Sequence, residues 1–215
     1  MIEEINTIPL EKILEVIRFM EHGSVMRVMF IMLTVTGCRI SELKRMHIDE
    51  LSEDGIYWKL GKNQKNFRFE KLPRSFIEEI IEMRKNNKCD RRLFPISGDT
   101  FVHYFNRNIR PKLSPCWTEK IRRFHYNRIQ NIHKYSLRLL RKNYQTLLFK
   151  KFLDKFKGHY DIALQFTSRS MKHSSTRMTA YHYLQGLDSL NDHDGKMPSE
   201  LISGVGHQTK LLKYV

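Results

Sequence analysis

The stretch SVMRVMFIMLTVTG (24–37) is apolar at most positions, and it limits the possible folds more than any other part of the sequence. A helix that is apolar around its whole circumference is stable only where other elements cover all its sides. The stretch ends at Gly37, and glycine commonly terminates helices. The sequence has no run of about 18 apolar residues, the length typical of a membrane span. We therefore expect a buried central helix surrounded by other elements.

Most of the remaining sequence has the apolar spacing of helices. The first helix begins at Leu10 and is expected to end at Gly23. After the central helix, a helix over 39–51 would bring Ile40, Leu43 and either Met46 or His47 to one face. Further helices are predicted within 75–86, within 93–109 after a loop and a cap at Asp99 or Thr100, within 135–156 as a long amphipathic helix, and within 161–171 and 174–184.

The period changes between residues 55 and 73. GIYWKL (55–60) and FRFEKLP (67–73) are short β-prone runs on either side of the polar turn GKNQKN. They predict a small β-hairpin or three-stranded sheet. The sequence has no internal repeats and no low-complexity segments. The predicted fold class is therefore mainly α with one small β element, in a single domain.

The charge indicates a polyanionic partner. The chain carries a net charge of +15, with a pI of about 9.8. Eleven Lys and Arg residues stand against the single acid Glu119 in the segment 107–142, so this segment supplies ten of those charges. Such a surplus causes self-repulsion unless a partner neutralises it, and nucleic acid is the commonest such partner.

The cysteines and the N-terminal sequence indicate the cellular compartment. Three scattered cysteines, Cys38, Cys89 and Cys116, form neither a disulfide framework nor a CxxC zinc pair. The N-terminal sequence MIEEINTIPL is acidic where a signal peptide would be basic. We therefore expect a soluble protein of a reducing, cytoplasmic environment, associated with a nucleic acid rather than with a membrane. The carboxylates lie mainly on predicted solvent faces, which does not fit the converging acids of two-metal chemistry.

An arginine stands at the junction between the central helix and the next predicted helix. Arg39 lies near a helix start, where the helix dipole disfavours a cation, so this arginine is expected to have another task. The surrounding sequence TGCRISEL (36–43) resembles the TG-x-R-x-SEL box of the tyrosine recombinases, the phage-type integrases. In that family this box carries the first active-site arginine.

Three further boxes of this family follow in the same order, so that the resemblance spans about residues 10–190. GKNQKNFRFEKLP is similar to the hairpin that carries the catalytic lysine, which maps to Lys65 or, as the second alignment, to Lys62. IHKYSLRLLRKNYQT is similar to the box of the second arginine, which maps to Arg138. MKHSSTRMTAYHYL is similar to the box that holds the third basic residue, His173, and the nucleophilic tyrosine.

The resemblance implies a site-specific DNA recombinase or integrase of a mobile genetic element, and therefore an enzyme. Its tyrosine would attack a phosphodiester of double-stranded DNA, giving a 3′-phosphotyrosyl intermediate and a free 5′-hydroxyl that later reseals the strand. The bond energy is conserved, so no cofactor or metal is implied. The implied catalytic residues are Arg39, Lys65, Tyr135, Arg138, His173 and Tyr183. The two arginines would stabilise charge on the phosphate, Lys65 would protonate the leaving oxygen and His173 would donate a hydrogen bond.

Two assignments within these boxes remain open. Tyr135 stands where the second box usually has histidine, and an alternative register makes Arg141 the second arginine with Arg138 in the histidine position. Tyr181 and Tyr183 are two residues apart, so on a helix they point about 200° away from each other. HYLQGLDS resembles the family's Y-x-x-x-LDS stretch and the HY of archaeal-virus integrases, and both favour Tyr183 over Tyr181 as the nucleophile.

The resemblance also predicts the domain organisation and the assembly. Residues 1–190 correspond to the catalytic domain, and 191–215 form a tail that is expected to dock on a neighbouring protomer of a homo-oligomer. The helical DNA-clamping domain that precedes the catalytic domain in most relatives is not expected in this sequence. Two alternative functions are a non-catalytic DNA-binding protein of the same fold and a strand transferase like type IB topoisomerases.

Overall fold

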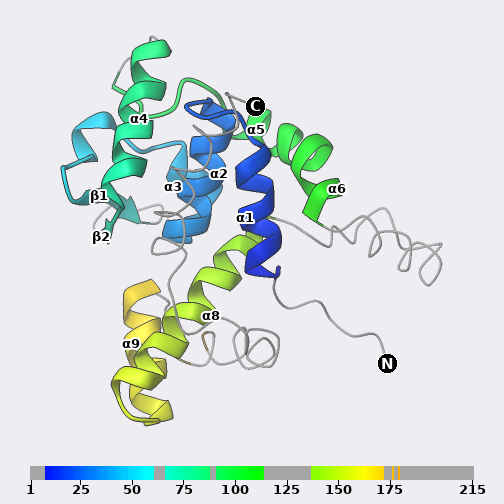
Figure 1. The fold of residues 1–215 in the computed structure, drawn as a ribbon. Helices are drawn as coiled ribbons and strands as arrows, with labels where there is room; N and C mark the ends of the chain where they lie inside the picture. Colours follow the sequence, from blue (N-terminus) through cyan, green and yellow to red (C-terminus); the bar gives the residue numbers. More distant parts are fainter. Residues whose placement is uncertain are drawn as a thin grey trace.

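The computed structural model describes residues 8–60, 66–87, 91–113 and 137–171, together with Thr176 and Thr179. Its elements follow one another as helices with one interposed hairpin (Figure 1). They are α1 (Leu10–Phe19), α2 (Val25–Thr36), α3 (Ile40–Leu43), the 3₁₀ turn η1 (Ile48–Glu50), β1 (Gly55–Leu60), β2 (Asn66–Lys71), α4 (Arg74–Asn86), α5 (Gly98–Tyr104), the π-helical turn η2 (Phe105–Ile109), α6 (Arg110–Leu113), α8 (Leu137–Lys155) and α9 (Tyr160–Met171). Within the described residues, no helix combines the length and apolarity needed to cross a membrane.

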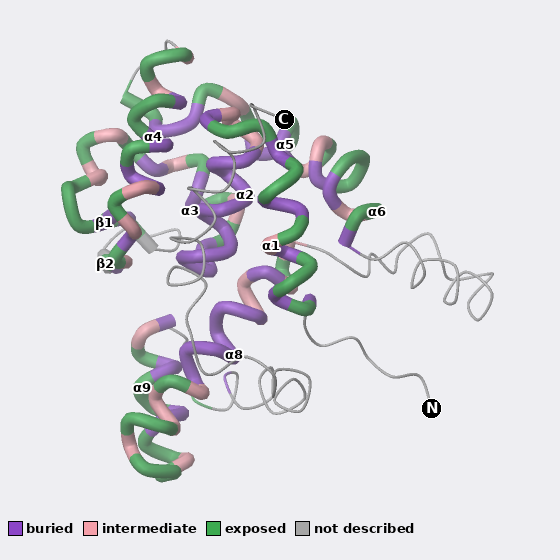
Figure 2. The backbone as a smooth tube through the Cα atoms, viewed as in Figure 1, coloured by how far each residue is buried: buried purple, intermediate pink, exposed green. Residues whose placement is uncertain are grey.

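Helix α2 is the predicted buried central helix. Every residue from Arg27 to Thr36 is buried, and Figure 2 shows this helix enclosed by the others. The Ser24 side chain caps its N-terminus by accepting a hydrogen bond from the backbone N–H of Arg27. Gly37 ends it with φ at 58°, in the left-handed region that glycine tolerates best. The apolar stretch therefore forms the core around which α1, α4, α5 and α8 pack.

Helix α1 packs one apolar face on α2, but it ends earlier than predicted. Its buried residues Leu10, Ile13, Val16 and Ile17 recur at helical spacing. The helix stops at Phe19, and Gly23 lies in the turn that follows, where its backbone N–H donates to Glu79 Oε1 over 3.0 Å. The expectation that this helix reaches Gly23 is wrong, because the turn is held by α4 instead.

The segment 39–51 is not the single helix that its apolar spacing predicts. Helix α3 ends at Leu43, because the chain then pairs with a segment further along the sequence. The backbone N–H of Leu93 donates to the Met46 carbonyl over 2.8 Å, and that of Ile48 donates to the Arg91 carbonyl over 2.9 Å. Met46 and Leu93 are both buried, so tertiary pairing overrides the local helical pattern here.

The predicted β element is a two-stranded antiparallel hairpin within the described residues. Trp58 pairs with Arg68 and Ile56 with Glu70 on the face that packs on the body, while Tyr57 and Phe69 contact each other on the outer face, with ring centroids 4.5 Å apart. The alternation of buried and exposed residues follows the two-residue period of a strand. The turn 61–65, which includes Lys62 and Lys65, lies outside the described residues.

The helix predicted within 93–109 has its N-cap two residues before Asp99, the nearer of the two expected caps. Ser97 is the N-cap residue, since its hydroxyl accepts a hydrogen bond from the backbone N–H of Thr100 over 3.1 Å. Asp99 and Thr100, the predicted caps, instead lie inside the first turn of α5. Neither predicted cap is therefore correct, and serine forms such a cap as readily as aspartate.

Helices α8 and α9 form a pair that extends away from the rest of the helical body (Figure 1). The prediction of a long helix over 135–156 is confirmed for Leu137–Lys155, but this helix is not amphipathic along its length. Every residue from Asn143 to Phe149 is buried, because α2 covers one side and α9 another. The predicted helix within 161–171 is confirmed as α9, and most of that within 174–184 lies outside the described residues.

Two carboxylates are exceptions to the expectation that the acids lie mainly on solvent faces. The side chains of Glu42 and Glu79 are 1% and 4% exposed. Glu79 forms an ion pair with Arg27 of α2, where Arg27 Nε lies 2.7 Å from Glu79 Oε1. Buried carboxylates are stable where cations and hydrogen-bond donors satisfy them, and both have such partners here. These two carboxylates therefore hold buried arginine contacts instead of facing solvent.

Candidate active site

Arg39 lies at the junction that the sequence singles out. Its backbone is extended, with φ of −77° and ψ of 151°, so it caps α3 directly after Gly37 and Cys38. The side chain is 53% exposed and can therefore reach a ligand. Its Nη1 donates to Glu42 Oε1 over 2.8 Å, and its backbone N–H donates to Glu42 Oε2 over 2.8 Å. The carboxylate of Glu42 thus fixes both the backbone and the guanidinium of Arg39.

Arg141 of α8 approaches the same carboxylate. Its Nη1 donates to the Gly37 carbonyl over 2.7 Å and lies 3.9 Å from Glu42 Oε2. The side chain is 12% exposed, so most of it is held inside the protein. Two guanidinium groups therefore share one carboxylate, which leaves one net positive charge at this point. A phosphate is the kind of group that such a pair of planar donors binds well.

Glu42 is a site residue that the sequence reasoning did not select. A signal was available, because Glu42 follows Arg39 by three residues, the spacing at which a helix-capping carboxylate reaches back to the cap residue. Its contact with Arg141, 99 positions away by numbering, could not be read from spacing. Only the packing of α8 against α2 brings these residues together.

Arg138 lies elsewhere on α8. It is exposed and stands three residues before Arg141, so it belongs to a different turn of the helix. Of the two alternatives that the sequence leaves open for the second arginine, Arg141 is the one that lies against Glu42. The remaining candidates, Lys65, Lys62, Tyr135, His173, Tyr181 and Tyr183, lie outside the described residues.

A second group of polar side chains, which we call the Arg68 cluster, consists of Arg68, Glu70 and Tyr144. The Tyr144 hydroxyl donates to Glu70 Oε2 over 2.6 Å, and Arg68 Nη2 lies 3.0 Å from the same oxygen and also contacts the Tyr144 hydroxyl. Burial raises the pKa of the Glu70 carboxyl, although Arg68 and Tyr144 oppose this shift. Burial likewise raises the pKa of Tyr144, so its phenol stays protonated as a donor.

Cys38, which separates Gly37 from Arg39 in the sequence, is buried. Burial raises the pKa of its thiol from 9.0 to about 12, with the charge of Glu42 adding to the shift and those of Arg141 and Arg68 opposing it. Only the thiolate is a strong nucleophile, so this cysteine is expected to be inert in the folded protein.

We expect iodoacetamide at pH 8 to label Cys38 about a thousandfold more slowly in the folded protein than in the urea-unfolded chain. Each pKa unit lowers the thiolate fraction by about tenfold, and burial restricts access further. Mass spectrometry of the Cys38 peptide after timed labelling measures the ratio. Equal labelling rates with and without urea would contradict the burial of this thiol.

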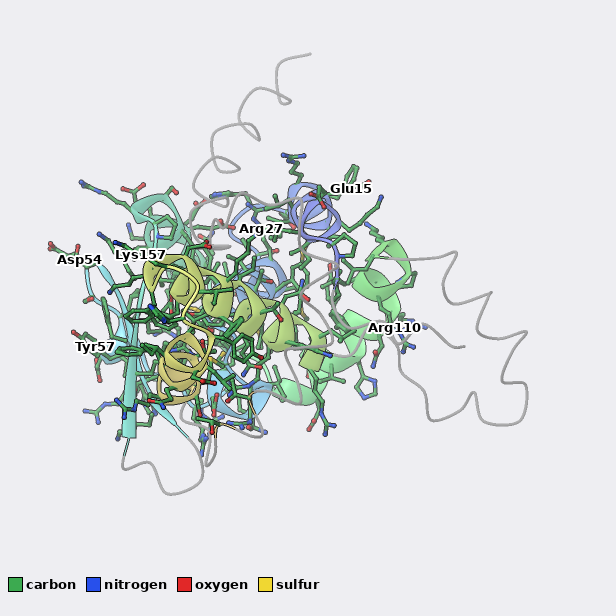
Figure 3. The ribbon with its side chains drawn as sticks, turned by 90° about the horizontal axis from the view of Figure 1, so that it is seen from below. Glu15, Arg27, Asp54, Tyr57, Arg110 and Lys157 are labelled. Atoms are coloured by element: carbon green, nitrogen blue, oxygen red, sulfur yellow. The ribbon has the colours of Figure 1, made fainter. Side chains whose placement is uncertain are left out.

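The first part of the basic segment 107–142 forms the outer side of η2 and α6. Arg107 and Lys112 are exposed, and a shallow hollow of about 470 Å³ is lined by His103, Asn106 and Arg107. In Figure 3, Arg110 of α6 and Tyr57 of the hairpin lie on opposite sides of α8. Within the described ranges, no group of three His, Cys, Asp or Glu side chains is arranged to hold a metal ion.

Comparison with known proteins identifies a structural relative. No protein-family model matches the sequence, and no curated protein matches it. Among solved structures, the chain is similar to the crystal structure of XerA recombinase, with a TM-score of 0.55 and 15% sequence identity. The match covers 96% of this chain and 63% of that chain, so this chain spans less than two thirds of the relative's length. The two proteins share a fold, which confirms the predicted mainly helical fold of the recombinase type.

Proposed function

We propose that this protein is a tyrosine-type site-specific DNA recombinase that integrates or otherwise rearranges a mobile genetic element. The observation that carries the proposal is the shared carboxylate of Glu42, with the guanidinium groups of Arg39 and Arg141 on it. This arrangement occurs in a fold shared with a recombinase. The order of the four sequence boxes adds independent support, because each box supplies a different part of one reaction.

The proposed reaction is a phosphoryl transfer through a protein intermediate. The oxygen of Tyr183 forms a bond to phosphorus while the bond from phosphorus to the 5′-oxygen breaks, and the tyrosine proton passes to a basic neighbour or to water. Arg39 and Arg141 stabilise the extra negative charge on the non-bridging oxygens, and His173 donates a hydrogen bond to them. The ammonium of Lys65 gives a proton to the leaving 5′-oxygen. Reversal of these steps by a free 5′-hydroxyl reseals the strand.

Arg141 replaces Arg138 as the preferred second arginine in this proposal. The alternative register then puts Arg138 in the position that the family usually fills with histidine, one turn earlier on α8. An exposed arginine there donates hydrogen bonds to a phosphate but does not carry protons at neutral pH. Tyr135, which the first register put in the histidine position, is left as a secondary contact to the DNA backbone.

The partners follow from the charge and from the fold. Double-stranded DNA neutralises the basic segment 107–142, beginning with the exposed Arg107 and Lys112. Residues 1–190 act as the catalytic domain, and the tail 191–215 docks on a neighbouring protomer of a dimer or tetramer assembled on DNA. The HY sequence before Leu184 associates the protein with the archaeal-virus or plasmid branch of the family. Such an enzyme works on DNA in the cytoplasm of the host cell.

The proposal predicts a covalent intermediate. The protein is incubated in EDTA with a nicked half-site duplex from the attachment region next to its gene, and the products are separated under denaturing conditions. We expect an adduct of protein with the 3′ end of the cleaved strand, because the phosphotyrosyl bond survives denaturation. Tyr183→Phe is expected to abolish this adduct while retaining DNA binding, and Tyr57→Phe serves as the matched control.

Other outcomes separate the alternative functions. Tight DNA binding by the wild-type protein without any adduct would contradict catalysis and support a non-catalytic DNA-binding protein. Adduct formation together with relaxation of supercoils, but without strand exchange between two sites, would instead indicate an enzyme like the type IB topoisomerases.

A further inference from the structure

The Arg68 cluster touches two of the segments that build the proposed active site. Tyr144 stands three residues after Arg141 on α8, and its ring packs directly on Gly37, two residues before Arg39. A Cβ atom on Gly37 would lie 2.6 Å from Tyr144 Cδ1, so there is no space between them. Tyr144 therefore packs against the backbone that leads to Arg39, and it stands on the same helix as Arg141.

The same cluster reaches the two other segments. Arg68 follows Lys65 by three residues, and its guanidinium lies 4.8 Å above the Tyr144 ring. Arg68 Nη1 lies 3.1 Å from the sulfur of Met171, which ends α9 two residues before His173. One guanidinium thus joins the hairpin, α8 and the end of α9. The four boxes that supply active-site residues meet at this single buried point.

Charged side chains are unusual on the inner, packed face of a strand. Arg68 and Glu70 lie on the face of β2 that packs on the body, where apolar side chains would be simpler to bury. Arg68 is 9% exposed, and it also lies 5.2 Å above the Trp58 ring. Directional hydrogen bonds fix relative positions more sharply than apolar contacts do. A role in fixing the position of the hairpin therefore explains why Arg68 and Glu70, and not apolar side chains, are buried here.

We propose that the Arg68 cluster is a positioning device that holds the hairpin bearing Lys65 in register with Arg39 and Arg141. This inference rests on the proposed function, because it assumes that Lys65 donates a proton to the leaving oxygen. Arg68 and Tyr144 are buried and act through Lys65, so they are positioning residues and do not touch DNA.

The proposal concerns one proton. As the bond between phosphorus and the 5′-oxygen breaks, a proton moves from the Lys65 ammonium to that oxygen, which requires the two atoms to lie within hydrogen-bond distance. A displacement of about 1 Å can slow such a step up to a hundredfold. A sulfur atom in place of the 5′-oxygen leaves without needing a proton, because a thiol has a pKa near 8.5 and that of an alcohol is far higher.

The test compares two leaving groups. Single-turnover adduct formation is measured on the half-site duplex with oxygen, and on the same duplex with sulfur, at the scissile 5′ position. Tyr144→Phe removes only the hydroxyl that links α8 to the hairpin, and Arg68→Lys keeps the positive charge but loses the planar guanidinium group with its several donors. Both variants are expected to react about ten- to a hundredfold more slowly than wild type on oxygen, and at nearly the wild-type rate on sulfur. Tyr160→Phe, the same change on α9, is expected to alter neither rate.

Hydrogen exchange provides a measurement that does not depend on catalysis. In Tyr144→Phe, the amides of β1 and β2 are expected to exchange roughly tenfold faster, the effect of losing about one hydrogen bond between the hairpin and α8. The amides of α2 are expected to exchange at the wild-type rate, which also shows that the variant is folded. Unchanged exchange in the hairpin would overturn the claim that the cluster holds it.

The kinetic outcomes distinguish the inference from the function on which it rests. Equal losses on oxygen and sulfur would mean that the cluster supports the fold without positioning Lys65, and unaltered rates on oxygen would overturn the inference as well. Absence of an adduct with the wild-type protein on both duplexes would instead contradict the proposed function.

Discussion

Replacing Arg141 with alanine is expected to slow adduct formation by roughly a hundred- to a thousandfold, the usual effect of removing one donor to a developing oxyanion. Arg141 shares Glu42 with Arg39 and is largely enclosed by protein, so its guanidinium is fixed before DNA arrives. Arg138 is exposed, and Arg138→Ala is expected to cost about tenfold, as for a single hydrogen bond to a charged oxygen.

Single-turnover rates on the half-site duplex measure this difference, with DNA binding determined separately for each variant. Arg39→Ala provides the comparison for a full loss, and Arg74→Ala provides the control, because Arg74 is 91% exposed and pairs only with Glu78 of its own helix among the ion pairs described. A larger loss from Arg138→Ala than from Arg141→Ala would restore the first register of the second box.

Replacing Glu79 with alanine is expected to lower the free energy of unfolding by about 3–5 kcal/mol, because the buried Arg27 loses its charge partner. Arg27 is 1% exposed, and Glu79 also accepts a hydrogen bond from the backbone N–H of Gly23. Removal of the carboxylate therefore leaves both a cation and a backbone donor without this acceptor. Urea unfolding measured by circular dichroism gives the change.

The neighbouring Glu78 supplies the matched control for this experiment. Its side chain is 65% exposed and pairs with the exposed Arg74, so Glu78→Ala is expected to cost less than about 1 kcal/mol. The double variant Arg27→Met, Glu79→Leu removes both charges and is expected to recover most of the lost stability. Wild-type stability in Glu79→Ala would contradict the burial of this ion pair.

The parts of the fold that sequence predicts well are those in which local pattern and tertiary environment agree. The apolar stretch before Gly37 predicted α2, because a helix buried on all sides is apolar around its circumference. The change of period predicted the hairpin, because a strand buried on one face alternates buried and exposed residues. In the segment after Leu43, the local pattern and the tertiary environment disagree. Its helical spacing persists, but backbone pairing of Met46 with Leu93 replaces the helix, and such a long-range pairing leaves no local signal.

In the candidate site too, some residues could be predicted from the sequence and others could not. Arg39 could be found from its place at a helix junction and from its box. Glu42 and Arg141 could not be paired from sequence, because their contact depends on how α8 crosses α2. The choice between Arg138 and Arg141 likewise depends on which turn of α8 faces Gly37. Charged residues on the inner face of β2 went unnoticed because a two-residue alternation normally assigns polar side chains to solvent.

The identity of the adducted residue tests the central claim most directly. The covalent complex formed on the half-site duplex is digested with protease and nuclease, and the peptide that carries the nucleotide is sequenced by mass spectrometry. The account predicts a phosphotyrosyl link on Tyr183. A link on Tyr181 would change the register of the last box but keep the reaction. A wild-type protein that binds the duplex tightly and never forms a link to any tyrosine would contradict the proposed enzyme.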